Sequence, residues 1–233
     1  MAKSRREIQR EETTAEIKAI ARTQMTETGA AALSLRAIAR EMKMSTPALY
    51  RYFENRDALV TALILDAYNA LADAMVAADG TVDELDFYGR FQAVTIAFRE
   101  WALQNPADFT LIYGTPIPGY EAPRDLTVPA AGRVLETFGL IFATASQAGK
   151  LQTPSRYVDL PEDMAAIIAE IYRQLGRDDV PKVAVTLTMF VWPRVYGLVW
   201  GEYYGHFPPG FTESGHFFTL EVNAMCEQFG LIR

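Results

Sequence analysis

Residues 34–57 read SLRAIAREMKMSTPALYRYFENRD, and this stretch predicts two short helices separated by a three-residue turn. Ser34 and Ser45 are good N-cap residues, because a serine oxygen accepts hydrogen bonds from the free amides of a first turn. Pro47 suits the start of the second helix. In a helix-turn-helix, the second helix of such a pair lies in the major groove of DNA. The stretch therefore predicts a DNA-reading element, although similar turns also occur in ordinary helical proteins.

The two predicted helices need an apolar face to hold them together and a small or polar face toward DNA. The expected inner residues are Ile38, Ala39, Met44, Leu49 and Phe53. The expected outer residues are Thr46, Pro47, Ala48, Tyr50 and Arg51. Small side chains can contact a thymine methyl group, and an arginine can reach a guanine edge or a phosphate. The hydroxyls of Tyr50 and Tyr52 are suited to phosphate contacts.

Basic residues flank this stretch on both sides. Lys3, Arg5, Arg6 and Arg10 precede or begin the first helix, and we expect them to lie over or enter the minor groove. Arg56 begins the helix that follows, where its charge and the free amides favour one phosphate. Residues 1–60 hold eleven lysines and arginines against eight aspartates and glutamates, which is +3, whereas the whole chain carries −7. The excess of positive charge therefore lies at the predicted DNA-binding end.

Composition bounds the class of protein. The chain has 233 residues, of which 50% are hydrophobic and 22% charged, as in a globular protein. Its single cysteine, Cys226, cannot form an internal disulfide, which fits a reducing cytoplasm. The first ten residues have no apolar core of a signal peptide. We find no apolar run of the roughly 18 residues that cross a membrane. These features predict a cytoplasmic protein with no membrane partner.

Helical periodicity dominates the rest of the chain and predicts an all-α protein. A small N-terminal three-helix domain, residues 1–56, precedes a long helix and a helical bundle, residues 57–233. Capping boxes at Ser4–Glu7 and Thr81–Glu84 are expected to open helices. Prolines and glycines between 113 and 129 predict a loop. The expected helices span about 4–28, 34–42, 45–53, 57–78, 81–104, 130–148, 161–175, 181–204 and 214–229.

The segments LRAIA (35–39), MSTPALYRYF (44–53) and NRDAL (55–59) closely resemble the DNA-binding head of the TetR family of bacterial transcriptional regulators. The resemblance implies a homodimer with an N-terminal DNA-binding domain, a C-terminal effector and dimerisation domain, and repression relieved by a small molecule. The residues then expected at DNA are Lys3, Arg5, Arg6, Ser34, Leu35, Arg36, Ser45, Thr46, Pro47, Ala48, Tyr50, Arg51, Tyr52 and Arg56.

This chain departs from the TetR pattern at several positions. Lys43 stands where the family usually has a turn glycine, and a left-handed lysine there costs roughly 1–2 kcal/mol. Tyr52 and Arg56 replace the usual histidine and lysine but keep a polar tip and a positive charge. The C-terminal half is similar to the subgroup named for a Trp-His-Gly element, with Tyr196 where that histidine is expected.

Aromatic residues are dense in the C-terminal half. Most are expected to be core, but ligand sites of helical bundles also lie between helices. The candidates for lining a ligand site are Phe98, Trp101, Phe109, Tyr113, Phe138, Phe142, Trp192 and Tyr196. By family analogy the last two helices form a four-helix dimer interface. Their apolar stripes, Val183–Val191 and Phe218–Phe229, suit either that interface or packing inside one chain.

These observations predict a ligand-responsive repressor, released from a near-palindromic DNA operator by a small apolar or aromatic effector. A TetR-like activator or a regulator that needs a co-repressor is the alternative. A helical-bundle enzyme or a scaffold protein is more remote, because His206 and His216 are the only histidines and form no metal-binding pattern. We expect no metal, no cofactor and no catalytic residue.

Overall fold

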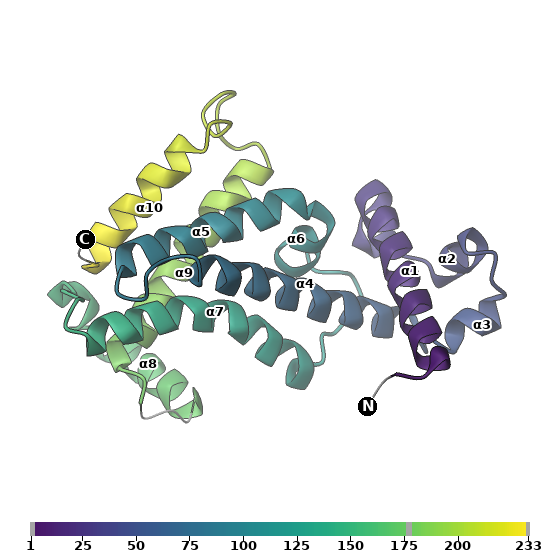
Figure 1. Cartoon of the computed structure of the whole chain (residues 1–233), viewed down its shortest axis with the longest axis horizontal. Coiled ribbons are helices and arrows are strands. Elements are labelled where there is room, and N and C mark those ends of the chain that lie inside the picture. Colours follow the sequence, from purple (N-terminus) through teal and green to yellow (C-terminus); the bar gives the residue numbers. More distant parts are fainter. Residues whose placement is uncertain (1–2, 176–178, 232–233) are drawn as a thin grey trace. The chain divides into compact units, whose positions relative to one another are not determined.

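The computed structural model describes residues 3–175 and 179–231, and its regular structure is helical throughout that part of the chain (Figure 1). The fold class is therefore all-α, as predicted. The α-helices are α1 (Arg5–Thr28), α2 (Leu35–Glu41), α3 (Thr46–Tyr50), α4 (Arg56–Asp79), α5 (Phe87–Gln104), α6 (Pro106–Tyr113), α7 (Arg124–Gln147), α8 (Glu162–Leu175), α9 (Lys182–Tyr203) and α10 (His216–Phe229).

The chain forms two compact units. Unit 1 comprises the residues up to Asn69 together with Gln104–Ala130, and unit 2 comprises Ala70–Leu103 and the residues from Ala131 onward. Unit 1 therefore contains α1, α2, α3, the first part of α4, α6 with the loop that follows it, and the first turns of α7. The division between the units falls within α4 and within α7, and both helices continue unbroken from one unit to the other.

Unit 1 has an aliphatic core under α1 to α3. α1 begins with the predicted capping box, in which the Ser4 hydroxyl accepts from the Glu7 amide and the Glu7 carboxylate accepts from the Ser4 amide. Its one buried face carries Ile17, Ala21 and Met25. The core residues that pack with this face include Leu33, Leu35, Ile38, Ala39, Leu49, Phe53, Leu59, Val60 and Leu63.

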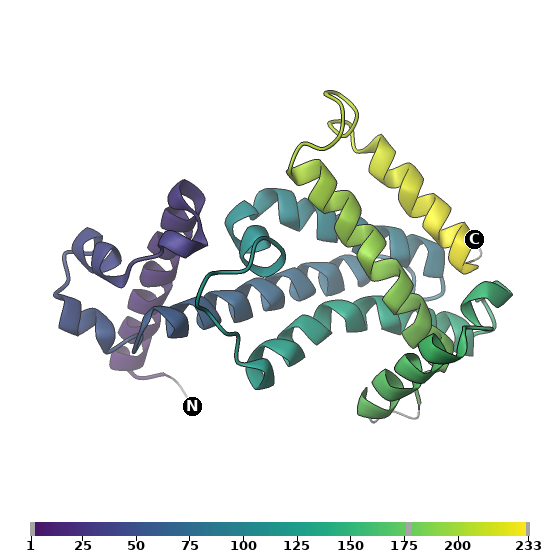
Figure 2. The same cartoon turned by 180° about the vertical axis from the view of Figure 1, so that it is seen from behind.

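Unit 2 has an aromatic core formed by α5, α7, α9 and α10. Phe91 of α5 lies 5.9 Å from Phe138 and 5.7 Å from Phe142 of α7, measured between ring centroids. Phe142 also lies 5.9 Å from Phe229 of α10. Figure 2 shows α10 running alongside α9. Rings at these distances contact one another, so they fill the interior of the bundle.

Two expected helix boundaries were wrong. The Thr81–Glu84 capping box does not open α5, because the Asp86 carboxylate accepts from the Gly89 amide and α5 begins at Phe87. The loop expected from 113 to 129 is shorter, since α7 already begins at Arg124 and contains Pro129. α6 was not predicted at all, because Pro106 ends one pattern and, as a residue of the first turn, begins the next helix.

α4, α7 and α9 are long and apolar enough to cross a membrane, by length and composition alone. This corrects the expectation that no such stretch exists. Less than half of the most apolar stretch of each helix is buried inside the protein. The apolar content has a structural use in each case, because α4 buries Leu59, Leu63, Ala67 and Leu71, while α7 and α9 bury Phe138, Phe142, Val191 and Val195.

Candidate nucleic-acid interface

α2 and α3 form the predicted helix-turn-helix inside unit 1. The Ser34 hydroxyl accepts from the Ala37 amide at 3.4 Å, and the Ser45 hydroxyl accepts from the Ala48 amide at 3.3 Å. The expected inner residues Ile38, Ala39, Leu49 and Phe53 are buried, and Met44 is half-buried. The sequence therefore correctly predicts the apolar residues that pack between the two helices.

The turn between α2 and α3 is a Schellman motif closed by a lysine. The Met44 amide donates to the Ala39 carbonyl at 2.8 Å, and the Lys43 amide donates to the Arg40 carbonyl at 3.1 Å. Lys43 has φ 54°, and it is the single non-glycine residue with positive φ in the part of the chain that the structure describes. The left-handed lysine that the sequence raised as a condition is therefore present, with its strain of roughly 1–2 kcal/mol.

The outer side of this element is polar and positively charged. Pro47, Tyr50 and Arg51 are exposed, whereas Thr46 and Ala48 are half-buried. Arg36, Arg40 and Lys43 are also exposed on α2 and the turn. Arg40 and Lys43 were not among the expected DNA contacts. The spacing of Arg40 from Arg36, four residues along α2, was the signal that places it on the same side. Lys43 lies beyond the end of α2, so helical spacing does not place it.

Two expected DNA contacts have other uses. The Leu35 side chain is only 5% exposed and belongs to the core of unit 1, so it cannot reach a base. Arg56 Nη2 donates to the carbonyl oxygens of Ala30 and Ala31 at 3.1 and 3.0 Å. The Arg56 guanidinium therefore holds the short segment between α1 and α2. Asn55 caps α4 by accepting from the Ala58 amide at 2.8 Å, which uses one of the amides expected to bind phosphate.

The N-terminal basic residues are exposed on or before the first turns of α1. Lys3 Nζ lies 2.6 Å from a Glu11 carboxylate oxygen in an exposed ion pair, which contributes little stability and competes weakly with a phosphate. The Arg10 guanidinium lies over the Tyr52 ring, 5.9 Å from its centroid. Tyr52 is half-buried and packs against the core of unit 1, while Arg5 and Arg6 are exposed.

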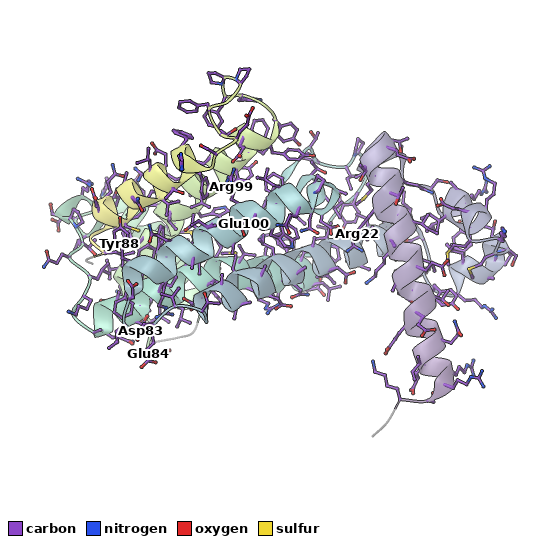
Figure 3. The ribbon with its side chains drawn as sticks, turned by 45° about the horizontal axis from the view of Figure 1, so that its top comes forward. Arg22, Asp83, Glu84, Tyr88, Arg99 and Glu100 are labelled. Carbon is purple, nitrogen blue, oxygen red and sulfur yellow. The ribbon has the colours of Figure 1, made fainter. Side chains whose placement is uncertain are left out.

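A partly buried ion-pair network joins α1, α4 and α6 within unit 1, and the sequence did not predict it. Arg22 Nε donates to both carboxylate oxygens of Asp108 at 2.9 Å, and Lys18 Nζ lies 2.8 Å from the Asp66 carboxylate (Arg22 is labelled in Figure 3). Burial raises the pKa of Asp108, although Arg22 opposes this shift. Lys18 and Arg22 flank the buried face of α1, which was the only signal for this network.

The aromatic ligand candidates are mostly packed against one another. Phe98, Phe109, Phe138 and Phe142 have no exposed surface, and Trp101 is 8% exposed. Phe109 and Tyr113 belong to unit 1, whereas the other six belong to unit 2. Trp192 and Tyr196 stack with centroids 5.9 Å apart, and burial raises the pKa of the Tyr196 hydroxyl. None of the eight candidates lines either of the hollows described next.

The apolar stripes of α9 and α10 pack inside the chain. Within the single chain, the buried members of these stripes include Leu187, Val191, Val222 and Phe229. Of the two expected uses of the stripes, these residues therefore serve packing inside one chain. A shallow hollow of about 410 Å³ lies on the outer faces of the same helices, lined by Arg194, Gly197, Leu198, Glu221, Ala224, Met225 and Gln228. A second hollow, of about 250 Å³, lies between α7, α8 and α9.

Comparisons with known proteins agree with this architecture. Residues 17–63 match the family of bacterial regulatory proteins described as the tetR family, and residues 91–225 match the tetracyclin repressor-like C-terminal domain. HTH-type transcriptional regulators of Mycobacterium tuberculosis (Rv1816) and Mycobacterium bovis (Mb1846) are 37% identical over 218 residues, which cover 93% of this chain and 92% of each relative.

Solved structures show the same fold. The crystal structure of the regulatory protein SCO4313 has a TM-score of 0.75 and 33% identity, and the match covers 96% of this chain and all of that one. A tetR-family regulatory protein from Rhodococcus RHA1 has a TM-score of 0.65 with 16% identity, covering 94% and 98% of the two chains. The second likeness bears on the fold alone.

The exposed helix-turn-helix on an all-helical scaffold, with these relatives, defines a DNA-binding transcriptional regulator. The chain belongs to the tetR family. Regulators of this family bind DNA and ligands and act as dimers. The C-terminal half matches the tetracyclin repressor-like C-terminal domain. This match does not test the expected Trp-His-Gly element.

Proposed function

We propose that the protein is a dimeric repressor that binds a near-palindromic DNA operator and releases it when a small molecule binds. One observation carries this proposal: α3 keeps Leu49 buried while leaving Tyr50 and Arg51 exposed, next to exposed cations on α2. A helix that presents polar side chains beside positive charge is suited to a major groove. In this proposal, residues 1–56 read DNA, and residues 57–233 bind the effector and dimerise in the cytoplasm, with no catalytic role, cofactor or membrane.

The proposed dimer uses the outer faces of α9 and α10. Leu220 is 67% exposed on α10, and the small residues Gly197 and Ala224 leave room for close approach of a second pair of helices. Two recognition helices about one DNA turn apart, roughly 34 Å, need a two-fold pair. Gly197→Arg tests this face, because nothing lies within 4 Å of a Cβ built at Gly197 and the position is exposed. The variant should stay folded but sediment as a monomer.

The proposed coupling runs along α4 and through α6. α4 passes continuously from unit 1 into unit 2, and α6 is tied to α1 by Arg22 and Asp108 within unit 1. An effector that prefers the DNA-incompetent arrangement by 1–3 kcal/mol would lower operator affinity about 5- to 150-fold. The proposal also includes membership of the Trp-His-Gly subgroup, with residues 192–197 as that element and Tyr196 at the histidine position.

Footprinting on the DNA that flanks the gene tests the proposal directly. We expect protection of a near-palindrome, with affinity that falls steeply as salt concentration rises. Substituting an expected contact residue, such as Ser45, Thr46 or Tyr50, should reduce either the sequence preference or the overall DNA affinity of the protein. Absence of binding to any duplex at low salt would overturn the proposal. Transcription that rises when the protein binds would instead favour the activator.

A further inference from the structure

We propose that the groove between α7, α8 and α9 binds an elongated molecule with an apolar body and one cationic end. The assignment rests on the proposed function, because it places the effector of that regulator and names its chemical class. The groove is lined by Gly132, Leu135, Glu136, Gly139, Leu140, Ala143, Thr144 and Gln147 of α7, Ile171 of α8, Asp179 and Val180, and Val185, Thr188 and Met189 of α9.

The groove is separate from the aromatic interior. Phe138 and Phe142 of α7 point to the filled core of unit 2, whereas Leu140 is 52% exposed on the groove side. Phe138 and Leu140 are two residues apart, which is about 200° around a helix. The space in unit 2 therefore lies on the side of α7 away from the buried rings.

The shape of the groove selects an elongated occupant. Its lining on α7 runs from Gly132 to Gln147, which is about 22 Å at 1.5 Å per residue. Gly132 and Gly139 keep it open: nothing lies within 4 Å of a Cβ built at Gly132, and one built at Gly139 would lie 3.3 Å from Thr188 Oγ1. The Gln147 amide donates to the Asp179 carbonyl at 3.0 Å and closes one end.

The charge of the groove selects the sign of the ligand. Glu136 and Asp179 are the charged residues among its described lining, and that lining contains no lysine or arginine. The remaining side chains are mostly apolar, as in small-molecule sites that use a few polar groups for orientation. Glu136 lies one turn of α7 from Gly132, at the end opposite the Gln147 contact. An anionic molecule would be repelled here, whereas a cationic end beside Glu136 is stabilised.

Matched alkyl probes test the assignment on the full-length protein, by calorimetry below the concentrations at which micelles form. Decyltrimethylammonium should bind, decanol should bind more weakly, and decyl sulfate should bind at least about 5-fold more weakly than the ammonium. Glu136→Gln should lower the ammonium affinity about 5-fold and leave decanol unchanged. Glu227→Gln, an exposed glutamate on α10 outside the groove, is the control.

Glycine variants test the place. Gly132→Leu should abolish binding of decyltrimethylammonium by filling the open end, while Gly132→Ala, with a similar effect on the helix, should keep it. Equal affinity for the ammonium and the sulfate, or binding that survives Gly132→Leu, overturns the assignment. If no probe binds and Gly132→Leu dissociates a dimer, a second copy covers the groove and the assignment is also overturned.

Operator binding measured in parallel separates the two proposals. If the operator is bound but the ammonium fails these tests, the groove assignment is lost and the repressor stands. If the ammonium behaves as expected but no duplex is bound, the repressor is lost and the binding site stands.

Discussion

The proposed DNA-reading surface of unit 1, which is the exposed side of α2 and α3, and the aromatic interior of unit 2 use their side chains in opposite ways. On α3, a single buried residue, Leu49, fixes the helix, and its neighbours Tyr50 and Arg51 are left to solvent. In unit 2, Phe98 and Phe142 have no exposed surface and contact other rings. A function on the first surface can change without disturbing the fold, whereas a ligand in the second would have to displace packing that stabilises it.

The largest expected effect is in the aromatic interior. Phe142→Ala should lower the free energy of unfolding by about 3–5 kcal/mol, because it leaves a cavity between Phe91 and Phe229. Denaturant titration of the full-length protein followed by circular dichroism measures the loss. A loss below about 1 kcal/mol, together with a changed response to an effector, would mean that Phe142 lines a ligand site and does not belong to the packed interior.

On the reading surface, Arg51→Ala should leave stability within about 0.5 kcal/mol and weaken operator binding by about 1–3 kcal/mol at one base-pair position. Fluorescence anisotropy with the operator and with single-base variants measures this change. Arg173→Ala is the matched control, since Arg173 is an exposed arginine of α8 that pairs with Glu170. If both variants weaken binding equally, Arg51 acts only through net charge.

Arg56 lies next to the reading surface but should behave like an interior residue. Arg56→Ala should lower the free energy of unfolding by about 1–3 kcal/mol, because two carbonyl oxygens between α1 and α2 lose their donor. Its operator affinity, corrected for the folded fraction, should change less than that of Arg51→Ala. A larger loss of affinity with unchanged stability would restore the phosphate contact expected from the sequence.

The difference between the two regions also explains what the sequence predicts. The helix-turn-helix depends on residues within about twenty positions of one another, and its serine caps and apolar spacing are visible locally. Leu35 shows the limit, since it lies next to exposed Arg36 but belongs to the core. The position of Leu35 on the buried face of α2 follows from the helical spacing of α2. The resemblance to the TetR family had instead implied that Leu35 lies at DNA.

A groove or cavity depends on where side chains are missing, and no local pattern reveals that. The aromatic residues of unit 2 have the composition of a ligand site but fill their own volume, while the open groove is lined by Gly132, Gly139 and Ala143. The pair Arg22 and Asp108 joins residues 86 apart in the sequence, and only the docking of α6 brings them together. Long-range placement is therefore what the sequence leaves undetermined.

A smaller effect on the free energy of unfolding is expected at the turn between α2 and α3. Three other helix ends form the same Schellman pattern with Gly149, Gly205 and Gly230 at the left-handed position, whereas this turn has Lys43. Lys43→Gly should raise the free energy of unfolding by about 1 kcal/mol, since glycine removes the strain but adds freedom to the unfolded chain. Lys43→Ala keeps the strain and should not stabilise. If Lys43→Ala is more stable than the native protein, the charge of Lys43, and not its backbone conformation, destabilises the turn.

The smallest expected effect is the pH dependence of the α1–α6 junction, a polar site inside unit 1. Burial raises the pKa of Asp108 in the folded protein despite Arg22, so the folded state binds this proton more readily than the unfolded state. Its contribution is therefore fully present below the ordinary aspartate pKa and is lost as pH rises through the raised folded pKa. Unfolding measured from acid to neutral pH should show the stability of the native protein falling relative to Asp108→Asn as pH rises. A rise instead would mean that Arg22 outweighs burial, so that the junction behaves like an exposed surface pair and unlike a packed interior.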